Sequence, residues 1–280
     1  MILIADSGSS KTSWTLVKEQ QIVFRFESEG YNPCYNDPEE ITGSLRKSLP
    51  MEYDWNKIEL VAFYGAGCYE DKYAVIENAL RPLFSKARFD VAMDLMASAR
   101  ALLGHDPGFA AILGTGTNSC LYDGKRITHN VDSMGFLLGD EGSGAYMGKR
   151  LIKDFIRGHM PDDIRGIFYD TYRLSPDELI DRVYANPMPN RYCASFARFL
   201  SGEQVSGHTY IENVKRDCFR DFFRNIVVYY PDYSGYLFNC VGSIGWVFMD
   251  TLTTVAEEFG MKTGKIIQSP MEGLIAFHQV

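Results

Sequence analysis

The sequence has little positive charge and no long apolar run, and each shortage excludes a class of protein. Its 280 residues include 28 Lys and Arg against 36 Asp and Glu, a formal net charge of −8 at pH 7. Nucleic acids and anionic membranes are bound largely through Lys and Arg, so neither is an expected partner. A membrane span needs about 20 apolar residues, and the N-terminal MILIAD lacks both the length and the basic region of a signal peptide. We therefore expect a cytoplasmic protein whose partner is a small molecule.

Cysteines spaced for metal binding or for a disulfide framework are also missing. The chain has six Cys and five His, with no C-x-x-C pair and no His at the spacing of zinc ligands. Both kinds of site leave such spacing in a sequence. We expect reduced, partly buried thiols and no metal site built from Cys and His.

The best-known nucleotide-binding loops are absent as well. The segment GSSKT at 8–12 lacks the Gly that precedes Lys in a Walker A loop, and GSGAYMGKR at 142–150 lacks the Ser or Thr that follows it. No G-x-G-x-x-G motif follows a predicted strand. A dinucleotide-binding fold is therefore disfavoured.

The sequence contains instead one pattern that occurs twice. An apolar run is followed by a turn of Gly, Ser and Thr and by two further strand-like runs, first at 1–28 and again at 109–130. Two such turns can hold the two ends of one polyphosphate, because Gly lets the main chain approach and N–H and hydroxyl groups can donate to phosphate. The repeat predicts nucleotide-dependent phosphoryl transfer.

Strands and helices alternate after each copy of the pattern. The expected elements are strands at 60–67, 89–94, 238–242 and 265–269 and helices at 73–84, 144–157, 219–230, 247–259 and 271–279. This order predicts an α/β protein with two lobes, each a mixed five-stranded sheet with flanking helices. We place the lobes at 1–104 and 105–270, with a helical insertion in the second. A C-terminal helix of about 271–280 could pack back on the first lobe.

The first turn begins with a carboxylate at the end of a strand. Asp6 could hold a hydrated Mg2+ that screens phosphate charge, and Gly8 lets the main chain approach the phosphate. The alternative is an ordinary hairpin turn, since Asp, Ser and Gly are favoured there too. The second copy of the pattern favours the phosphate interpretation.

The second turn has two glycines and two threonines. Thr115, Gly116 and Thr117 offer N–H and hydroxyl donors to a phosphate, and the amide of Asn118 could bond a sugar hydroxyl. A simple Gly-containing hairpin is the alternative, but two β-branched Thr residues are not an obvious choice for a tight turn.

Asp94 ends one predicted strand and starts a helix. It could cap that helix by accepting N–H bonds from the first turn. It could equally act as a base toward a hydroxyl, because α/β proteins bind ligands at the carboxyl edge of their sheets. The spacing does not decide between these two interpretations, and they are compatible.

Two further turns could bind parts of a ligand. Asp140 and Glu141 lie among glycines before a helix, where they could bind several sugar hydroxyls or serve only as helix-capping charges. The glycines favour the ligand interpretation. Gly242 and Ser243 form a third small-residue turn, suited to a nucleotide base or ribose or to close packing of strand and helix.

These motifs resemble those of the BadF/BadG/BcrA/BcrD ATPase family, and within it the N-acetylglucosamine kinase branch of the actin/hexokinase/Hsp70 superfamily. The resemblance covers nearly the whole chain and rests on DSGSSKTSW, GYNP, ILGTGTNS, LLGDEGSGA and VGSI. It implies two RNase H-like (actin-like ATPase) lobes that close over ATP and a sugar. It also implies Mg2+-dependent phosphorylation of the 6-hydroxyl of N-acetylglucosamine or a related amino sugar, and it leaves a homodimer open.

The resemblance gives each candidate residue a role. Asp94 would be the general base, and Asp6 would help to hold Mg2+. The other assignments are Gly8, Ser10, Lys11, Thr115, Gly116 and Thr117 near the phosphates, Gly242 and Ser243 at the nucleoside, and Asn32, Asn118, Gly135, Asp140 and Glu141 at the sugar. Met134 stands where relatives often carry an aromatic residue close to the amino sugar.

Two other functions are open. The chain could be an ATPase that activates a partner enzyme, although activators of the dehydratase type hold an iron–sulfur cluster with cysteines that the scattered ones here do not match. It could also be a non-catalytic sugar sensor. The presence of both Asp6 and Asp94 favours chemistry over sensing.

Overall fold

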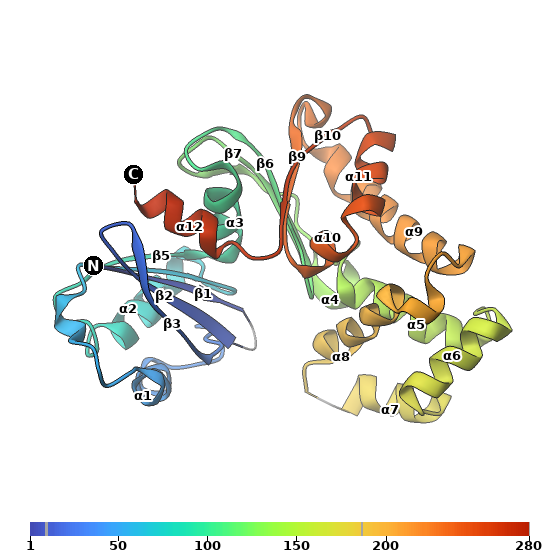
Figure 1. Cartoon of the computed structure of the whole chain (residues 1–280), viewed down its shortest axis with the longest axis horizontal. Helices are drawn as coiled ribbons and strands as arrows, with labels where there is room; N and C mark the ends of the chain where they lie inside the picture. Colours follow the sequence, from blue (N-terminus) through green and yellow to red (C-terminus); the bar gives the residue numbers. More distant parts are fainter. Residues whose placement is uncertain (9–10, 186, 280) are drawn as a thin grey trace. The chain divides into compact units, whose positions relative to one another are not determined.

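The computed structural model describes residues 1–8, 11–185 and 187–279. They form two compact units, which Figure 1 shows in ribbon form. The first comprises the chain up to Asp106 together with the C-terminal segment from Pro270, and the second runs from Pro107 to Ser269. Each unit is described by itself.

The first unit is built on a mixed five-stranded sheet in the order β3-β2-β1-β4-β5. Its strands are β1 (Ile2–Ser7), β2 (Lys11–Lys18), β3 (Gln21–Glu29), β4 (Leu60–Gly65) and β5 (Arg88–Met93). β2 is antiparallel to β1 and to β3, whereas β4 and β5 run parallel to β1. The carboxyl ends of β1, β4 and β5 therefore lie at one edge of the sheet.

The described residues of the first unit also form four α-helices: α1 (Pro38–Ser48), α2 (Tyr73–Leu80), α3 (Asp94–Leu103) and α12 (Met271–His278). α1 starts with a capping box, in which Asp37 accepts the N–H of Glu40 and the Glu40 side chain accepts the N–H of Asp37. α12 crosses α3 so closely that a Cβ on Gly273 would lie 2.4 Å from the carbonyl oxygen of Ala101. The C-terminal helix is thus part of the first unit.

The second unit repeats this topology in a sheet of order β10-β9-β6-β7-β8. Its strands are β6 (Gly108–Leu113), β7 (Thr117–Tyr122), β8 (Ile127–His129), β9 (Leu237–Val241) and β10 (Lys262–Ile267). β7 is antiparallel to β6 and β8, while β9 runs parallel to β6 and β10. The repeat in the sequence is a repeat of sheet topology, and the predicted pair of mixed five-stranded sheets is confirmed.

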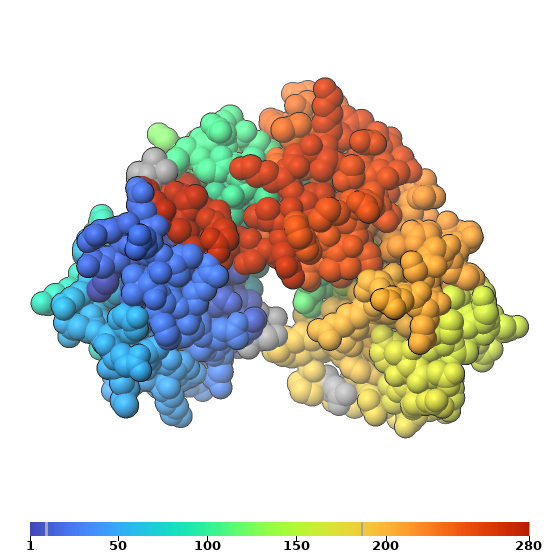
Figure 2. All heavy atoms as spheres, viewed as in Figure 1, coloured from blue at the N-terminus to red at the C-terminus, as the bar shows by residue number. Residues whose placement is uncertain are grey.

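The second unit carries many more helices than the first. They are α4 (Gly135–Leu138), α5 (Gly144–Arg157), α6 (Asp162–Tyr172), α7 (Pro176–Ala185), α8 (Pro189–Ser195), α9 (Thr209–Asn225), α10 (Ser243–Val247) and α11 (Met249–Glu258). The segment from α6 to α8 lies at the surface of the unit, in yellow-green to gold in Figure 2. One buried cluster, which includes Phe168, Phe196, Phe222 and Phe238, runs from these helices to β9 of the sheet. Among the described residues, no helix has the length and apolar character needed to cross a bilayer.

Candidate functional site

Two carboxylates lie at the carboxyl edge of the first sheet. Asp6 is the penultimate residue of β1, and Asp94 follows β5 directly. Strand register aligns Ser7 with Gly65 and Gly65 with Met93, so both carboxylates lie at the same edge. Burial, together with the negative charge of Asp94, raises the pKa of Asp6 to about 6.

The carboxylate of Asp94 is not the N-cap of the helix that follows. Met93 is the N-cap residue of α3 and makes no side-chain capping bond. Asp94 is the first helical residue, and its Oδ1 accepts the N–H of Leu95 at 2.8 Å. Burial raises the pKa of Asp94, so this carboxyl is a stronger base than an exposed one.

Asn32 is held at the same edge by contacts that local sequence patterns do not reveal. The hydroxyl of Ser7 accepts the N–H of Tyr31 at 3.0 Å and donates to the Tyr31 carbonyl at 3.2 Å. Asn32 packs directly on Gly67, where an added Cβ would lie 2.3 Å from Asn32 Oδ1. Ser7 and Gly67 therefore position Asn32 from the ends of β1 and β4.

The first turn is partly described. The N–H of Gly8 donates to the carbonyl of Lys11 at 3.0 Å, which closes the turn between β1 and β2. Lys11 Nζ lies 2.5 Å from Glu27 Oε1 in an exposed ion pair, a kind of pair worth little in solution. Ser10 lies outside the described residues.

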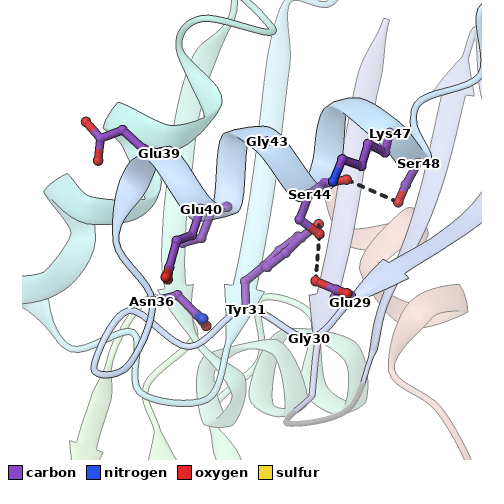
Figure 3. A pocket seen from close by; sticks show the side chains of 11 residues that line it. Glu29, Gly30, Tyr31, Asn36, Glu39, Glu40, Gly43, Ser44, Lys47 and Ser48 are labelled. Carbon is purple, nitrogen blue, oxygen red and sulfur yellow. Dashed lines mark hydrogen bonds between the residues drawn. The ribbon is translucent and has the colours of Figure 1, made fainter.

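A polar cavity of about 590 Å3 opens beside the loop that carries Asn32 (Figure 3). It lies between α1 and residues 29–36, with Tyr31, Ser44 and Glu29 among its lining residues. Ser44 Oγ donates to Glu29 Oε2 at 2.8 Å and lies 3.2 Å from the Tyr31 hydroxyl. None of the predicted site residues lines this cavity, so it is distinct from the edge where Asp6 and Asp94 lie.

In the second unit, the second Gly-rich turn is joined to the start of α5. The N–H of Gly144 donates to the carbonyl of Gly114 at 2.8 Å, and the N–H of Ala145 donates to that of Thr115 at 3.1 Å. Ser143 caps α5 by accepting the N–H of Tyr146 at 3.1 Å. The turn predicted to hold phosphate is thus fixed against a capped helix.

Gly242 brings the third small-residue turn to the same place. It has a φ of 130°, and a Cβ there would lie 2.3 Å from the carbonyl oxygen of Leu113. Only glycine fits this contact. The start of α10, with Ser243, therefore lies against the end of β6, from which Gly114 and Thr115 continue.

Asp140 and Glu141 contact the second turn through Thr117. The main-chain N–H of Thr117 donates to Asp140 Oδ1 at 3.1 Å, and its hydroxyl donates to the Glu141 carbonyl at 2.7 Å. A Cβ on Gly116 would lie 3.0 Å from Asp140 Oδ2. Burial raises the pKa of Asp140, while the Thr117 N–H and the charge of Lys149 oppose the rise.

The other two residues assigned to the sugar in this unit lie on β7 and at the start of α4. Side chains alternate along a strand, so Asn118 points to the opposite face of β7 from Thr117. Its Oδ1 accepts an N–H of the Asn130 amide at 2.9 Å. Gly135 opens α4 with a φ of 65°, directly after Met134, whose side chain is 59% exposed.

Comparison with known proteins points to sugar kinases. A protein of known structure from Porphyromonas gingivalis, provisionally assigned as an N-acetylglucosamine kinase, is 38% identical. The alignment covers 100% of this chain and 99% of that chain, with a TM-score of 0.95. A ROK family glucokinase from Streptomyces griseus, solved with glucose and AMPPNP, is 14% identical over 98% of this chain and 97% of its own. Its TM-score is 0.59, and at this identity it shows the shared fold alone.

A third relative matches part of the chain. The N-acetylmuramic acid/N-acetylglucosamine kinase of Clostridium acetobutylicum is 25% identical over 169 residues, which are 58% of this chain and 54% of that protein. The match therefore spans about half of that relative's length. No family model matches the chain.

Proposed function

The chain belongs to the same family as the Porphyromonas gingivalis protein, and from this relationship we propose that it is an ATP-dependent kinase of N-acetylglucosamine or a related amino sugar. The phosphate acceptor is the 6-hydroxyl. The motifs in the Gly-rich turns support a place in the BadF/BadG/BcrA/BcrD branch of the actin-like ATPases.

The observation that carries the proposal is the pair of carboxylates at one edge of the first sheet. Asp94 has a pKa raised by burial, which suits a general base. It takes the proton of the 6-hydroxyl while the sugar oxygen bonds to the γ-phosphorus and the bond from that phosphorus to the β-phosphate oxygen breaks. The products are the sugar 6-phosphate and ADP.

Asp6 is suited to a hydrated Mg2+. Its carboxyl is largely desolvated and lies within the field of the Asp94 charge, so a divalent cation would favour its ionised form. Mg2+ is typically held by one or two carboxylates together with substrate phosphates. Among the described residues, no group of three or more His, Cys, Asp or Glu is placed to bind a metal. When bound, Mg2+ would neutralise charge on the phosphates.

The remaining residues would position the two substrates. Thr115, Gly116 and Thr117 would donate to phosphate oxygens, as would Gly8, Ser10 and Lys11 from the first unit. Gly242 and Ser243 would contact the nucleoside. The sugar would be oriented by Asn32, Asn118, Gly135, Asp140 and Glu141. Phosphoryl transfer depends mainly on such positioning and on charge stabilisation.

Release of ADP by the purified protein tests this proposal. The assay would compare N-acetylglucosamine, glucosamine, N-acetylmannosamine, N-acetylmuramic acid and glucose at equal concentrations with Mg2+ and ATP. Scalar coupling between the phosphorus and the C6 protons would identify the acceptor oxygen by NMR. We expect turnover of at least one amino sugar and phosphate on O6. Sugar binding without turnover would favour the sensor alternative, and bound iron would favour the activator.

A further inference from the structure

The second unit has a mostly apolar cavity whose lining includes none of the residues assigned to ATP and the sugar. Its volume is about 600 Å3, within the range of small-molecule sites. It lies among helices α4, α5, α7 and α8. Twelve residues line it, among them Leu137, Ile152, Ile156, Val183 and Tyr184.

Three cations line this otherwise apolar cavity. Lys149, Lys153 and Arg157 are spaced four residues apart on α5, so their side chains lie on one face of the helix. In the described part of the chain, none of the three forms a salt bridge, and none of the twelve lining residues is acidic. By contrast, Arg150 on the same helix pairs with Asp154 at 2.7 Å. Lys149 Nζ donates to the carbonyl of Phe136 and lies 4.7 Å from the centre of the Phe136 ring, so Lys153 and Arg157 are the two cations at this cavity that the described residues leave without a partner.

The apolar wall is open to a ligand. Leu137 and Tyr184 line the cavity, and each is 85% exposed. Clustered exposed apolar side chains of this kind mark binding surfaces. A sugar or sugar phosphate would place many hydroxyls against this wall without hydrogen-bond partners, so neither the substrate nor the product is a suitable occupant.

We propose that this cavity binds an amphipathic carboxylic acid. The apolar body would lie against Ile152, Ile156 and Val183, and the carboxylate would meet Lys153 and Arg157 at the rim. A charge-assisted contact with a carboxylate is stronger than a neutral hydrogen bond, and the cations gain a partner that the chain itself does not supply. The body could be an alkyl chain or an aromatic system.

Titration calorimetry with decanoate and with naphthalene-2-carboxylate tests this proposal. We expect at least one acid to bind with a stoichiometry of one per chain, and the comparison of the two acids identifies the kind of body. Decan-1-ol, which lacks the charge, should bind at least tenfold more weakly than decanoate if the body is an alkyl chain. Naphthalene-2-carboxamide should bind more weakly than naphthalene-2-carboxylate, by the same factor, if the body is aromatic.

Variants distinguish binding of the carboxylate in this cavity from a general attraction of anions to the positive charges of the protein. The double variant K153A/R157A should weaken binding at least tenfold, whereas K125A/K262A, which removes the same charge from exposed positions elsewhere in the second unit, should not. Neither pair should change the basal turnover. V183W should block the cavity, with its fold checked by circular dichroism. The proposal is overturned if neither acid binds, or if K153A/R157A binds as the parent does. It is also overturned if sedimentation shows a dimer that V183W dissociates, because a second copy would then cover the cavity.

Discussion

The main-chain N–H of Thr117 donates to Oδ1 of Asp140 at 3.1 Å, across 23 residues of sequence. The Thr117 hydroxyl also donates to the carbonyl of Glu141 at 2.7 Å. Asp140 is buried and has a left-handed φ of 60°, so its carboxylate is held in one place. Thr117, which is assigned to phosphate, and Asp140, which is assigned to the sugar, are thus joined directly by a hydrogen bond.

Two substitutions of Asp140 separate its structural task from its proposed contact with the sugar. Asp140→Ala leaves the buried N–H of Thr117 without an acceptor, which should lower the free energy of unfolding by about 1–3 kcal/mol. Asp140→Asn keeps an oxygen acceptor and removes the charge. We expect its unfolding temperature to stay close to that of the parent and its KM for the sugar to rise at least tenfold. A parental KM in Asp140→Asn would remove Asp140 from the sugar site.

Asp94→Asn tests the proposed general base. The amide cannot take the proton of the 6-hydroxyl, so kcat should fall by about 100- to 10,000-fold, the usual range for loss of a general base. The Kd for ATP, measured by calorimetry without sugar, should not change. Asp106→Asn, at an exposed position in the same unit, is the matched control and should keep full activity. Unchanged turnover in Asp94→Asn would refute the assignment.

The two sheets could be predicted because each copy of the repeat encodes its own local pairing. β1 to β3 and β6 to β8 are successive antiparallel strands, and the strand-like runs expected within residues 1–28 pair through a tight turn at Glu19 and Gln20. Helix ends were harder to predict. The helix expected at 219–230 is α9 (Thr209–Asn225), which starts ten residues earlier because His208 caps it by accepting the N–H of Tyr210. Histidine is not among the favoured N-cap residues.

Breaks and shifts within elements also went unpredicted. The helix expected at 247–259 is α11 (Met249–Glu258), and Phe248 separates it from α10, which ends at Val247. The strand expected at 265–269 is β10 (Lys262–Ile267), because its pairing with β9 begins at Lys262 and contains a register shift. Apolar periodicity does not show where hydrogen bonding to a neighbouring strand begins or ends.

The site residues that the sequence did not reveal act through distant contacts. Ser7 meets Tyr31 across 24 residues, and Gly67 meets Asn32 across a longer stretch of chain. Such contacts leave no local pattern. Gly67 stands at the end of a strand expected at 60–67, but its contact with Asn32 depends on a side chain that folding brings to it.

Gly67→Ala tests whether Gly67 positions Asn32. An alanine there has a left-handed φ of 76° and places its Cβ 2.3 Å from Asn32 Oδ1. Gly158→Ala is the matched control, because its φ of 69° lies in the left-handed helical region and a Cβ there has no atom within 4 Å. Both should lose about 1–2 kcal/mol from the left-handed backbone. Gly67→Ala should lose more stability, and it alone should raise the KM for the sugar. Equal KM values in the two variants would contradict a role for Asn32 in sugar binding.

Asp6→Asn should stabilise the protein at neutral pH while it abolishes activity. The pKa of Asp6 rises from 3.8 to about 6 on folding, so the native state binds this proton more tightly than the unfolded state does. Stability is therefore lost as the pH rises from about 4 to about 6, and the loss stays constant at higher pH. A rise of this size corresponds to about 3 kcal/mol, which the neutral amide would avoid.

Chemical denaturation of the parent and of Asp6→Asn between pH 4 and pH 8 measures this difference without added metal. We expect Asp6→Asn to be more stable than the parent at pH 8 by up to about 3 kcal/mol, with a gap that narrows as the pH falls through 6. MgCl2 with ADP should also narrow the gap, because a bound cation stabilises the ionised carboxylate of the parent and has no such partner in the variant. A gap that does not depend on pH would mean that the Asp6 carboxylate is not desolvated at the edge of the first sheet. A stability difference that depends on pH but not on Mg2+ would show that Asp6 is buried but does not bind the metal.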